Sequence, residues 1–272
     1  MNPTDSAYQR LINMVITWGA LIETRNHAAY SLIDSDVMMF AKTPLVTVRK
    51  TAWRKALREM EWFLSGDSEC PDDLKDWWDG QLSPADRYID GYGNQLRHWG
   101  GDFDQVQHLI DGLTAHPASR RHILTTWNAV EMADITTTNR NPNTPTCCHG
   151  TVIQYFVRSN QLHASHYQRS ADLLLGLPHN LIQHWALLLW LATQSGLQPG
   201  SLRWILGDAH IYAEPTHLEV AHAIINTNPY ERTLPPPTLV YQATPGIEFK
   251  AHDFALIGTI AGPVTTTRPR LL

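Results

Sequence analysis

The sequence predicts an α+β protein, because helical and strand patterns both occur along the chain without regular alternation. Residues 180–195 place apolar side chains on one face of a helix. Residues 151–168 hold two alternating runs on either side of Arg158-Ser159-Asn160, which is the pattern of a β-hairpin. No repeat or low-complexity linker divides the 272 residues, so we expect a single domain over 1–272.

Four other segments have the spacing of amphipathic helices. The first covers residues 7–22, and the second covers residues 53–65 and ends at Gly66. Residues 104–115 and 214–226 are predicted as the other two helices. Three of these helices precede the predicted hairpin, and the fourth follows it.

The helix over 180–195 has the clearest boundaries. Asn180 stands where an N-cap is expected, and Gly196 follows the last turn. The chain after residue 226 returns to short strands and prolines. Three remaining stretches are predicted as non-helical: an irregular segment over 67–104, a strand over His122–Trp127 and a polar loop over 133–147.

The composition is that of an ordinary globular protein, with 43% hydrophobic and 17% charged residues. The net charge of −5 argues against a general nucleic-acid binder, because such proteins usually carry positive charge to replace counterions on phosphates. The N-terminal residues lack the pattern of a signal peptide. The longest apolar run, Ala186–Ala192, is too short for a bilayer span, which takes ~20 residues. Three cysteines make no disulfide framework, so we expect a cytoplasmic protein without a membrane partner.

Three segments carry most of the chemical information, and they read TPTCCHGTVIQYFV, YQRSADLLLGLPHN and GDAHIYAEPTHLEV. Upstream lie PLVTVRK, REMEWFLSGD, DGYGNQLRHW and SRRHILTTWN. Together these segments resemble the thymidylate synthase superfamily, in the right order and spacing, over roughly residues 7–258. The resemblance implies the thymidylate synthase fold: a large mixed β-sheet with flanking helices, packed sheet to sheet in a homodimer.

The resemblance places Cys148 at the position of the family's covalent nucleophile, followed by the expected His149. Carbon C5 of uracil is a poor nucleophile, and addition of a thiolate at C6 turns the ring into an enolate that reacts at C5. A thiolate is favoured by cationic groups nearby. Taken alone, Cys147 and Cys148 could be a buried structural pair or half of a metal site. With the resemblance, no metal is expected.

The resemblance also implies a phosphate site of four arginines. Arg25 and Arg169 would come from the same subunit, and Arg120 and Arg121 from the partner subunit. The planar guanidinium donates two parallel hydrogen bonds to phosphate, and Ser170 would add a hydroxyl donor. Arg169 would also keep the thiolate charged. Shared arginines imply a two-fold homodimer, whereas Arg120 and Arg121 on their own would be read as a solvated charge pair.

Asn180 would select the base. Uracil presents an acceptor at O4 and a donor at N3, and one side-chain amide complements both. Cytosine reverses that edge, and cytidylate-modifying relatives commonly carry aspartate at this position, so Asn180 indicates dUMP. His210 and Tyr212 match the pair that binds the sugar 3′-hydroxyl.

Four further residues match positions around the reacting ring and the folate. Glu59 matches an acid that orders water near O4 and passes protons, which is general acid–base work. Tyr92 matches a tyrosine implicated in proton removal from C5. Asp172 matches the carboxylate that binds the pterin ring. Trp78, with Trp77 as the adjacent alternative, matches a tryptophan that packs on the folate, and the implied co-substrate is 5,10-methylenetetrahydrofolate.

The sequence departs from the synthase pattern in four places. NHAAYSL follows Arg25, PTC precedes Cys148, and Gln81 replaces a second tryptophan. The C-terminal segment, FALIGTIAGPVTTTRPRLL, lacks the usual Tyr…Pro-His-Pro pattern of a tail that seals water out before hydride transfer. We therefore predict that water ends the reaction and gives 5-hydroxymethyl-dUMP. Such hydroxymethylases are associated with viruses, phages among them, that replace thymine in their DNA.

Three alternatives stay open at this point. An ordinary thymidylate synthase would make dTMP and dihydrofolate. A relative of the cytidylate-modifying type would act on dCMP instead. A catalytically silent relative would bind only nucleotide or RNA. Against this last alternative, six residues with matching chemistry occur together: Cys148, Arg169, Asp172, Asn180, His210 and Tyr212.

Overall fold

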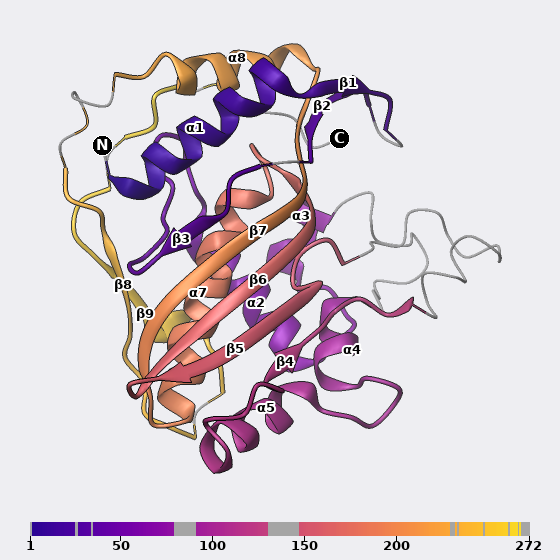
Figure 1. Ribbon diagram of the computed structural model, residues 1–272, viewed down its shortest axis with the longest axis vertical. Coiled ribbons are helices and arrows are strands. Elements are labelled where there is room, and N and C mark those ends of the chain that lie inside the picture. Colours follow the sequence, from indigo (N-terminus) through magenta and orange to yellow (C-terminus); the bar gives the residue numbers. More distant parts are fainter. Residues whose placement is uncertain are drawn as a thin grey trace.

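The structure is a computed structural model that describes the chain except for residues 1, 25–26, 34, 79–90, 130–146, 229–231, 233, 247, 261, 266 and 268–272. Its elements confirm the predicted α+β class, with a large mixed sheet and helices packed against it (Figure 1). Within the described residues, no helix combines the length and apolar character needed to cross a membrane.

The main sheet has the strand order β1-β2-β7-β6-β5-β4, and β3 also pairs with β7. Among the strand pairs in the described part of the chain, β6 and β7 alone run parallel, and this long pair brings Ser170 opposite Asp208 and Asp172 opposite His210. The carboxyl ends of both strands therefore carry predicted site residues to one end of the sheet. The strands are β1 (Ala20–Ile22), β2 (Ala29–Leu32), β3 (Met38–Phe40), β4 (Ile123–Leu124), β5 (Val152–Arg158), β6 (Gln161–Asp172) and β7 (Gln198–Tyr212), and a separate two-stranded sheet pairs β8 (Thr238–Tyr241) with β9 (Phe254–Ile257).

The helix α7 (Leu177–Gln194) lies between the sheet and α2 (Trp53–Ser65), as Figure 1 shows. Because it is enclosed on most sides, its sequence is apolar on most sides rather than in one stripe. The helices α1 and α8 pack side by side across one end of the sheet. The other helices are α1 (Pro3–Trp18), η1 (Asp72–Leu74), α3 (Lys75–Trp78), α4 (Tyr92–Arg97), α5 (Gln105–Ala115), α8 (Pro215–Ile225) and η3 (Ala251–Asp253).

The predicted hairpin and several helices are confirmed. Ser159 and Asn160 join β5 to β6 with φ of 48° and 62°, the two positive values that a tight type I′ turn requires. The helix α2 has the predicted bounds and ends at Gly66, whose φ is 82°. The helix α5 starts after Asp104, which caps it by accepting a hydrogen bond from the Gln107 N–H.

Three predicted boundaries were wrong. The helix predicted over 7–22 is α1, which ends at Trp18 because the following residues pair with β2 as strand β1. The strand predicted over His122–Trp127 shrinks to β4, since the side chains of Gln105 and Thr125 bond the backbone of Thr125 and Trp127 that follows it. The segment predicted as irregular over 67–104 contains η1, α3 and α4. The loop predicted over 133–147 lies outside the described residues except for Cys147.

The predicted N-cap was also wrong. Helix α7 begins at Leu177, three residues before Asn180, with Pro178 in its first turn. Proline is well suited to a first turn because its missing N–H has no partner there anyway. The Asn180 side chain is therefore released from capping and contacts other side chains.

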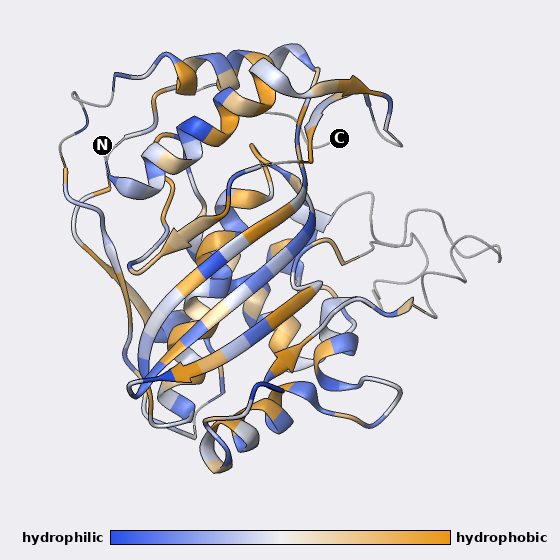
Figure 2. Ribbon diagram, viewed as in Figure 1, coloured by the Kyte–Doolittle hydropathy of each residue, from blue (hydrophilic) through white to orange (hydrophobic). Residues whose placement is uncertain are grey.

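One face of the main sheet is covered by none of the described helices (Figure 1). Residues of β5 and β6 alternate between buried and more exposed positions, and Figure 2 shows polar and apolar residues alternating along β6 and β7. Val152 and Tyr167 are register partners, so they project on the same, more exposed side. Ile123 and Met39 extend this apolar side onto β4 and β3. An exposed apolar sheet face is typical of a protein interface.

Candidate active site

Cys148 lies just before β5, against Tyr92 at the start of α4. The Tyr92 hydroxyl oxygen accepts a hydrogen bond from the Cys148 N–H at 2.9 Å and lies 3.4 Å from the Cys148 Sγ. Burial, together with the nearby Cys148 sulfur, raises the pKa of Tyr92 well above its usual range. The hydroxyl therefore keeps its proton and can donate it to the sulfur, which stabilises a thiolate.

Arg169 holds the segment that carries Cys148, the predicted nucleophile. Its Nε donates to the Cys147 carbonyl at 3.1 Å, and its backbone N–H donates to the Cys148 carbonyl at 3.2 Å. The guanidinium lies 5.4 Å from the centre of the Trp127 ring. This arrangement places the guanidinium, a permanent positive charge, beside the Cys147–Cys148 segment.

Glu59 is buried on α2 and accepts two hydrogen bonds. Trp78 Nε1 donates to Oε1 at 2.7 Å, and Gln183 Nε2 donates to Oε2 at 2.6 Å. Burial raises the pKa of Glu59 to about 7, although these two donors and Lys55 act in the opposite direction. A carboxyl group that titrates near neutral pH is suited to general acid–base work.

A cluster of aromatic side chains lies between Glu59 and Cys148. Phe63 stacks on Tyr92 with ring centres 4.4 Å apart, and the Trp78 ring lies 6.4 Å from Tyr92. Trp78 is buried and directed at Glu59, whereas Trp77 packs against His179 at 4.8 Å. The two adjacent tryptophans therefore contact different residues, Trp78 the Glu59 carboxylate and Trp77 the His179 ring.

Asn180 is held between two buried glutamines. Gln168 Nε2 donates to Asn180 Oδ1 at 3.1 Å, and Asn180 Nδ2 donates to Gln183 Oε1 at 3.2 Å. Gln183 is thus bonded both to Asn180 and to Glu59. Sequence reasoning missed both glutamines; the available signal for Gln183 was a polar residue one turn after Asn180 in a helix with many apolar residues.

His210 is oriented by Asp208, a third residue that sequence reasoning missed. His210 Nδ1 lies 2.9 Å from Asp208 Oδ2, and the hydroxyl groups of Ser31 and Ser170 also donate to this carboxylate. Burial acts to raise the pKa of Asp208, but the bonds from His210 and Ser31 hold it below its usual range. With a proton on Nδ1, the Nε2 of His210 remains for another partner. Tyr212 stands beside it, with ring centres 5.3 Å apart.

Asp172 lies opposite His210 at the end of β6. Its Oδ1 accepts hydrogen bonds from the N–H groups of Leu174 and Leu175 at 2.7 and 2.9 Å. Its other oxygen takes no hydrogen bond from any residue that the structure describes. A free carboxylate oxygen fits the predicted binding of ring N–H donors of a pterin.

Of the four predicted phosphate arginines, the structure describes three, and in one subunit these three do not lie together. Arg120 and Arg121 are exposed and precede β4 at the edge of the sheet, where the Arg120 carbonyl accepts a bond from Gln154. Arg25 lies outside the described residues. Arg169 contacts the segment of Cys147 and Cys148. Ser170 lies near the end of β6, where its hydroxyl contacts Asp208.

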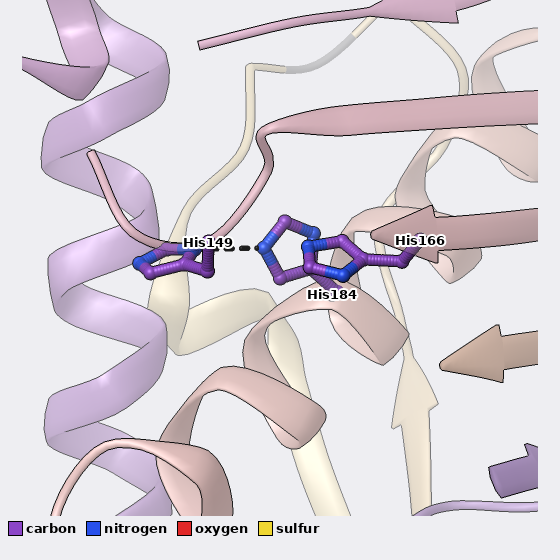
Figure 3. A group of neighbouring side chains, drawn as sticks. All are labelled: His149, His166 and His184. Carbon is purple, nitrogen blue, oxygen red and sulfur yellow. Dashed lines mark hydrogen bonds between the residues drawn. The ribbon is translucent and has the colours of Figure 1, made fainter. Parts of the chain in front are cut away.

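Three buried histidines lie near Cys148, and Figure 3 shows His184 between His149 and His166. One nitrogen of each lies within 4.8 Å of the others, a spacing that could hold a metal ion. Two observations do not fit such a site. His166 Nε2 already accepts the Gly150 N–H, and the Nδ1 atoms of His166 and His184 have no partner among the described residues. Metal-bound histidines usually donate their second N–H to an acceptor.

Burial lowers the pKa of all three histidines, that of His149 to about 3. They therefore pack as neutral rings, with His149 Nδ1 and His184 Nε2 3.0 Å apart and His166 stacked on Trp204. His149 in turn stacks on Tyr92 at 4.3 Å. Through His149, the histidines therefore contact Tyr92, the partner of Cys148, from the core side.

Comparison with known proteins identifies the family. The family described as thymidylate synthase matches residues 6–264. A protein named thymidylate synthase from Cereibacter sphaeroides is 34% identical over 256 residues, which cover 81% of this chain and 82% of the relative. The chain belongs to the thymidylate synthase family. It is therefore a methyltransferase-class one-carbon transferase, of a family that binds dUMP and uses 5,10-methylenetetrahydrofolate.

The family membership confirms the predicted resemblance at the level of the thymidylate synthase family. Neither the hydroxymethylase subtype nor an association with phages receives support from the relatives. The name of the Cereibacter protein favours the alternative, an ordinary synthase.

Proposed function

We propose that this member of the thymidylate synthase family methylates dUMP and releases dTMP and dihydrofolate. Cys148 adds to C6 of the uracil ring, Asn180 binds the O4–N3 edge, and Glu59 moves protons near O4. Arg169 and Ser170 bind the phosphate, together with Arg25. His210 and Tyr212 bind the sugar hydroxyl. The folate supplies the one-carbon unit and then a hydride, and is itself oxidised to dihydrofolate.

The contact between Tyr92 and Cys148 carries the proposed covalent step. A hydroxyl that donates to Sγ and a cation that holds the adjacent carbonyls both favour negative charge on the sulfur. Once Cys148 has added to C6, charge develops at O4, where Glu59 with its pKa of about 7 can supply a proton at neutral pH. The same carboxyl group can accept a proton later in the cycle.

The position of the C-terminal segment supports a synthase rather than a hydroxymethylase. The Val264 N–H donates to the Val48 carbonyl at 2.8 Å, and Arg232 holds the Gly262 carbonyl at 2.8 Å. Val48 precedes Arg49, whose charge acts on Tyr8 and on His179. Tyr8 also faces the charge of Asp172, the proposed pterin ligand. A C-terminal segment anchored at this end of the site is suited to excluding water during hydride transfer.

The product distinguishes the two outcomes. With dUMP and labelled 5,10-methylenetetrahydrofolate, we expect the nucleotide to gain a methyl group, and dihydrofolate to form in equal amount. Mass spectrometry of the nucleotide and the absorbance of dihydrofolate measure both. A nucleotide that carries a hydroxymethyl group, with tetrahydrofolate as the other product, would overturn the synthase proposal and restore the hydroxymethylase prediction. Turnover of dCMP in preference to dUMP would contradict the proposed substrate.

A homodimer through the open sheet face belongs to the same proposal. The apolar side chains on that face, Ile123, Val152 and Tyr167 among them, require cover, and Arg120 and Arg121 lie exposed beside them. In a two-fold dimer the two arginines would reach the phosphate site of the partner subunit.

Complementation between two inactive variants tests the shared site. Cys148→Ser and Arg121→Glu homodimers should both be inactive. After unfolding and refolding together, about half of the dimers are mixed, and each mixed dimer has one intact site, so about a quarter of wild-type activity should return. Two Cys148→Ser preparations refolded together serve as the control. No recovery in dimers shown to be mixed would contradict the arginine assignment.

A further inference from the structure

Gln183 is a fully buried polar residue on α7 that connects two parts of the proposed site. Its Oε1 accepts from Asn180 Nδ2 at 3.2 Å, while its Nε2 donates to Glu59 Oε2 at 2.6 Å and to the Ala56 carbonyl at 3.0 Å. All the hydrogen-bonding atoms of the amide are thus engaged. We propose that Gln183 is a positioning residue that fixes the direction of the Asn180 amide, and so selects uracil over cytosine, while holding Glu59 in the same network.

The direction of the Gln183 amide follows from the Ala56 carbonyl. A backbone carbonyl can only accept, so the atom of Gln183 that faces it must be the nitrogen. The oxygen of Gln183 must then face Asn180. It follows that Asn180 presents its nitrogen to Gln183.

Gln168 leads to the same result from the other side of Asn180. Its Nε2 donates to the Ser170 carbonyl at 2.9 Å, so this atom too is identified as a nitrogen by a backbone acceptor. The same Nε2 donates to Asn180, which must present its oxygen there. Two independent backbone carbonyls therefore give one consistent direction for the Asn180 amide.

The donor and the acceptor that remain on the Asn180 amide match the hydrogen-bonding edge of uracil. The amide keeps one N–H and one lone pair beyond its bonds to the two glutamines. These fit the O4 acceptor and the N3 donor of uracil. Cytosine would require the amide to rotate by half a turn, which would place two acceptors together at Gln183 and two donors together at Gln168. Selection against cytosine thus depends on the glutamines as well as on Asn180.

The second bond of Gln183 reaches the proton-transfer group. Gln183 and Trp78 are the two side chains that donate to Glu59, and both stabilise its ionised form. The titratable groups whose charges act with Glu59 are Lys55, on the same helix, and Cys70, on the segment before η1. Loss of the Gln183 donor removes one stabilising bond and leaves these groups in place, so the proton on Glu59 should become harder to remove.

The test compares Gln183→Met with wild type, because methionine keeps the length of the side chain and removes its hydrogen bonds. We expect the preference for dUMP over dCMP, measured as the ratio of binding constants by calorimetry, to fall roughly 10- to 100-fold. The ionisation of Glu59 in the pH profile of kcat/KM should move to higher pH. Gln194→Met, at the partly exposed end of the same helix, should change neither quantity.

Gln168→Met provides a second variant with a different expected pattern. It removes a contact of Asn180 and none of Glu59, so the dUMP preference should fall while the Glu59 ionisation stays in place. This inference depends on the proposed function, and the two fail in different ways. A wild-type protein that neither binds nor converts dUMP would end the proposed function. A wild-type protein that prefers dUMP, with a folded Gln183→Met variant that keeps both the preference and the ionisation, would overturn the role of Gln183.

Discussion

Replacement of Cys148 by serine should lower kcat by at least about 10⁴-fold while dUMP binding stays within a few-fold of wild type. Removal of a nucleophile typically costs several orders of magnitude, because the covalent route is lost altogether. The serine hydroxyl is far less acidic than a thiol, and neither the Tyr92 hydroxyl nor Arg169 compensates for that difference. Binding should persist because the atoms assigned to phosphate, sugar and base are on other residues. Steady-state kinetics and calorimetry with dUMP measure the two effects.

The matched control for this variant is the adjacent cysteine. Cys147 is buried, and Arg169 bonds its carbonyl group, which every residue type supplies. Cys147→Ala should therefore keep most of the activity. Equal loss of activity in both variants, or retained turnover in Cys148→Ser, would contradict the assignment of the nucleophile.

Replacement of Glu59 by glutamine should lower kcat/KM by about 10²- to 10⁴-fold, the range expected when a general acid–base group is lost. Both carboxylate oxygens of Glu59 accept hydrogen bonds, from Trp78 and from Gln183. A glutamine amide would turn a donor toward one of these donors and could not exchange a proton. Glu61→Gln is the control, because Glu61 is on the same helix but pairs with Arg58 and Lys250 instead.

The pH dependence of Glu59→Gln tests whether the loss of activity comes from the loss of an ionisable carboxyl group. Burial raises the pKa of Glu59 to about 7, so the group holds its proton below that pH and is ionised above it. The wild-type profile of kcat/KM should therefore contain an ionisation near pH 7, and Glu59→Gln should lack it. A profile with the same ionisation in both proteins would assign it to another group.

The parts of the fold that sequence predicts well are those with local causes. Ser159 and Asn160 form the predicted turn because their residue types tolerate positive φ, and Gly66 ends α2 for a similar reason. Strand β1 was missed because its pairing with β2 depends on contacts that local spacing does not contain. The start of α7 was misplaced because Asn180 satisfies the rule for a cap while its side chain is used elsewhere.

The site shows the same division. Motifs predict Cys148 and Asn180 as the reacting and base-reading groups, because chemistry restricts the residue types that can serve there. The supporting bonds arise from positions brought together by folding, such as Gln183 with Glu59 or His210 with Asp208. Local sequence patterns gave no indication of the first pair. The second lies within one motif, GDAHIY, but a carboxylate that serves only to orient a histidine has no distinct sequence signal.

The most direct test of the account is the covalent bond between Cys148 and the pyrimidine. The enzyme is incubated with 5-fluoro-dUMP and 5,10-methylenetetrahydrofolate, digested, and its peptides are weighed and fragmented. Because fluorine at C5 takes the place of the proton that must leave, the enzyme should be trapped as an adduct. We expect the added mass of nucleotide and folate on the Cys148 sulfur. An unmodified peptide around residue 148 in enzyme that turns over dUMP, or an adduct on another residue, would contradict the account.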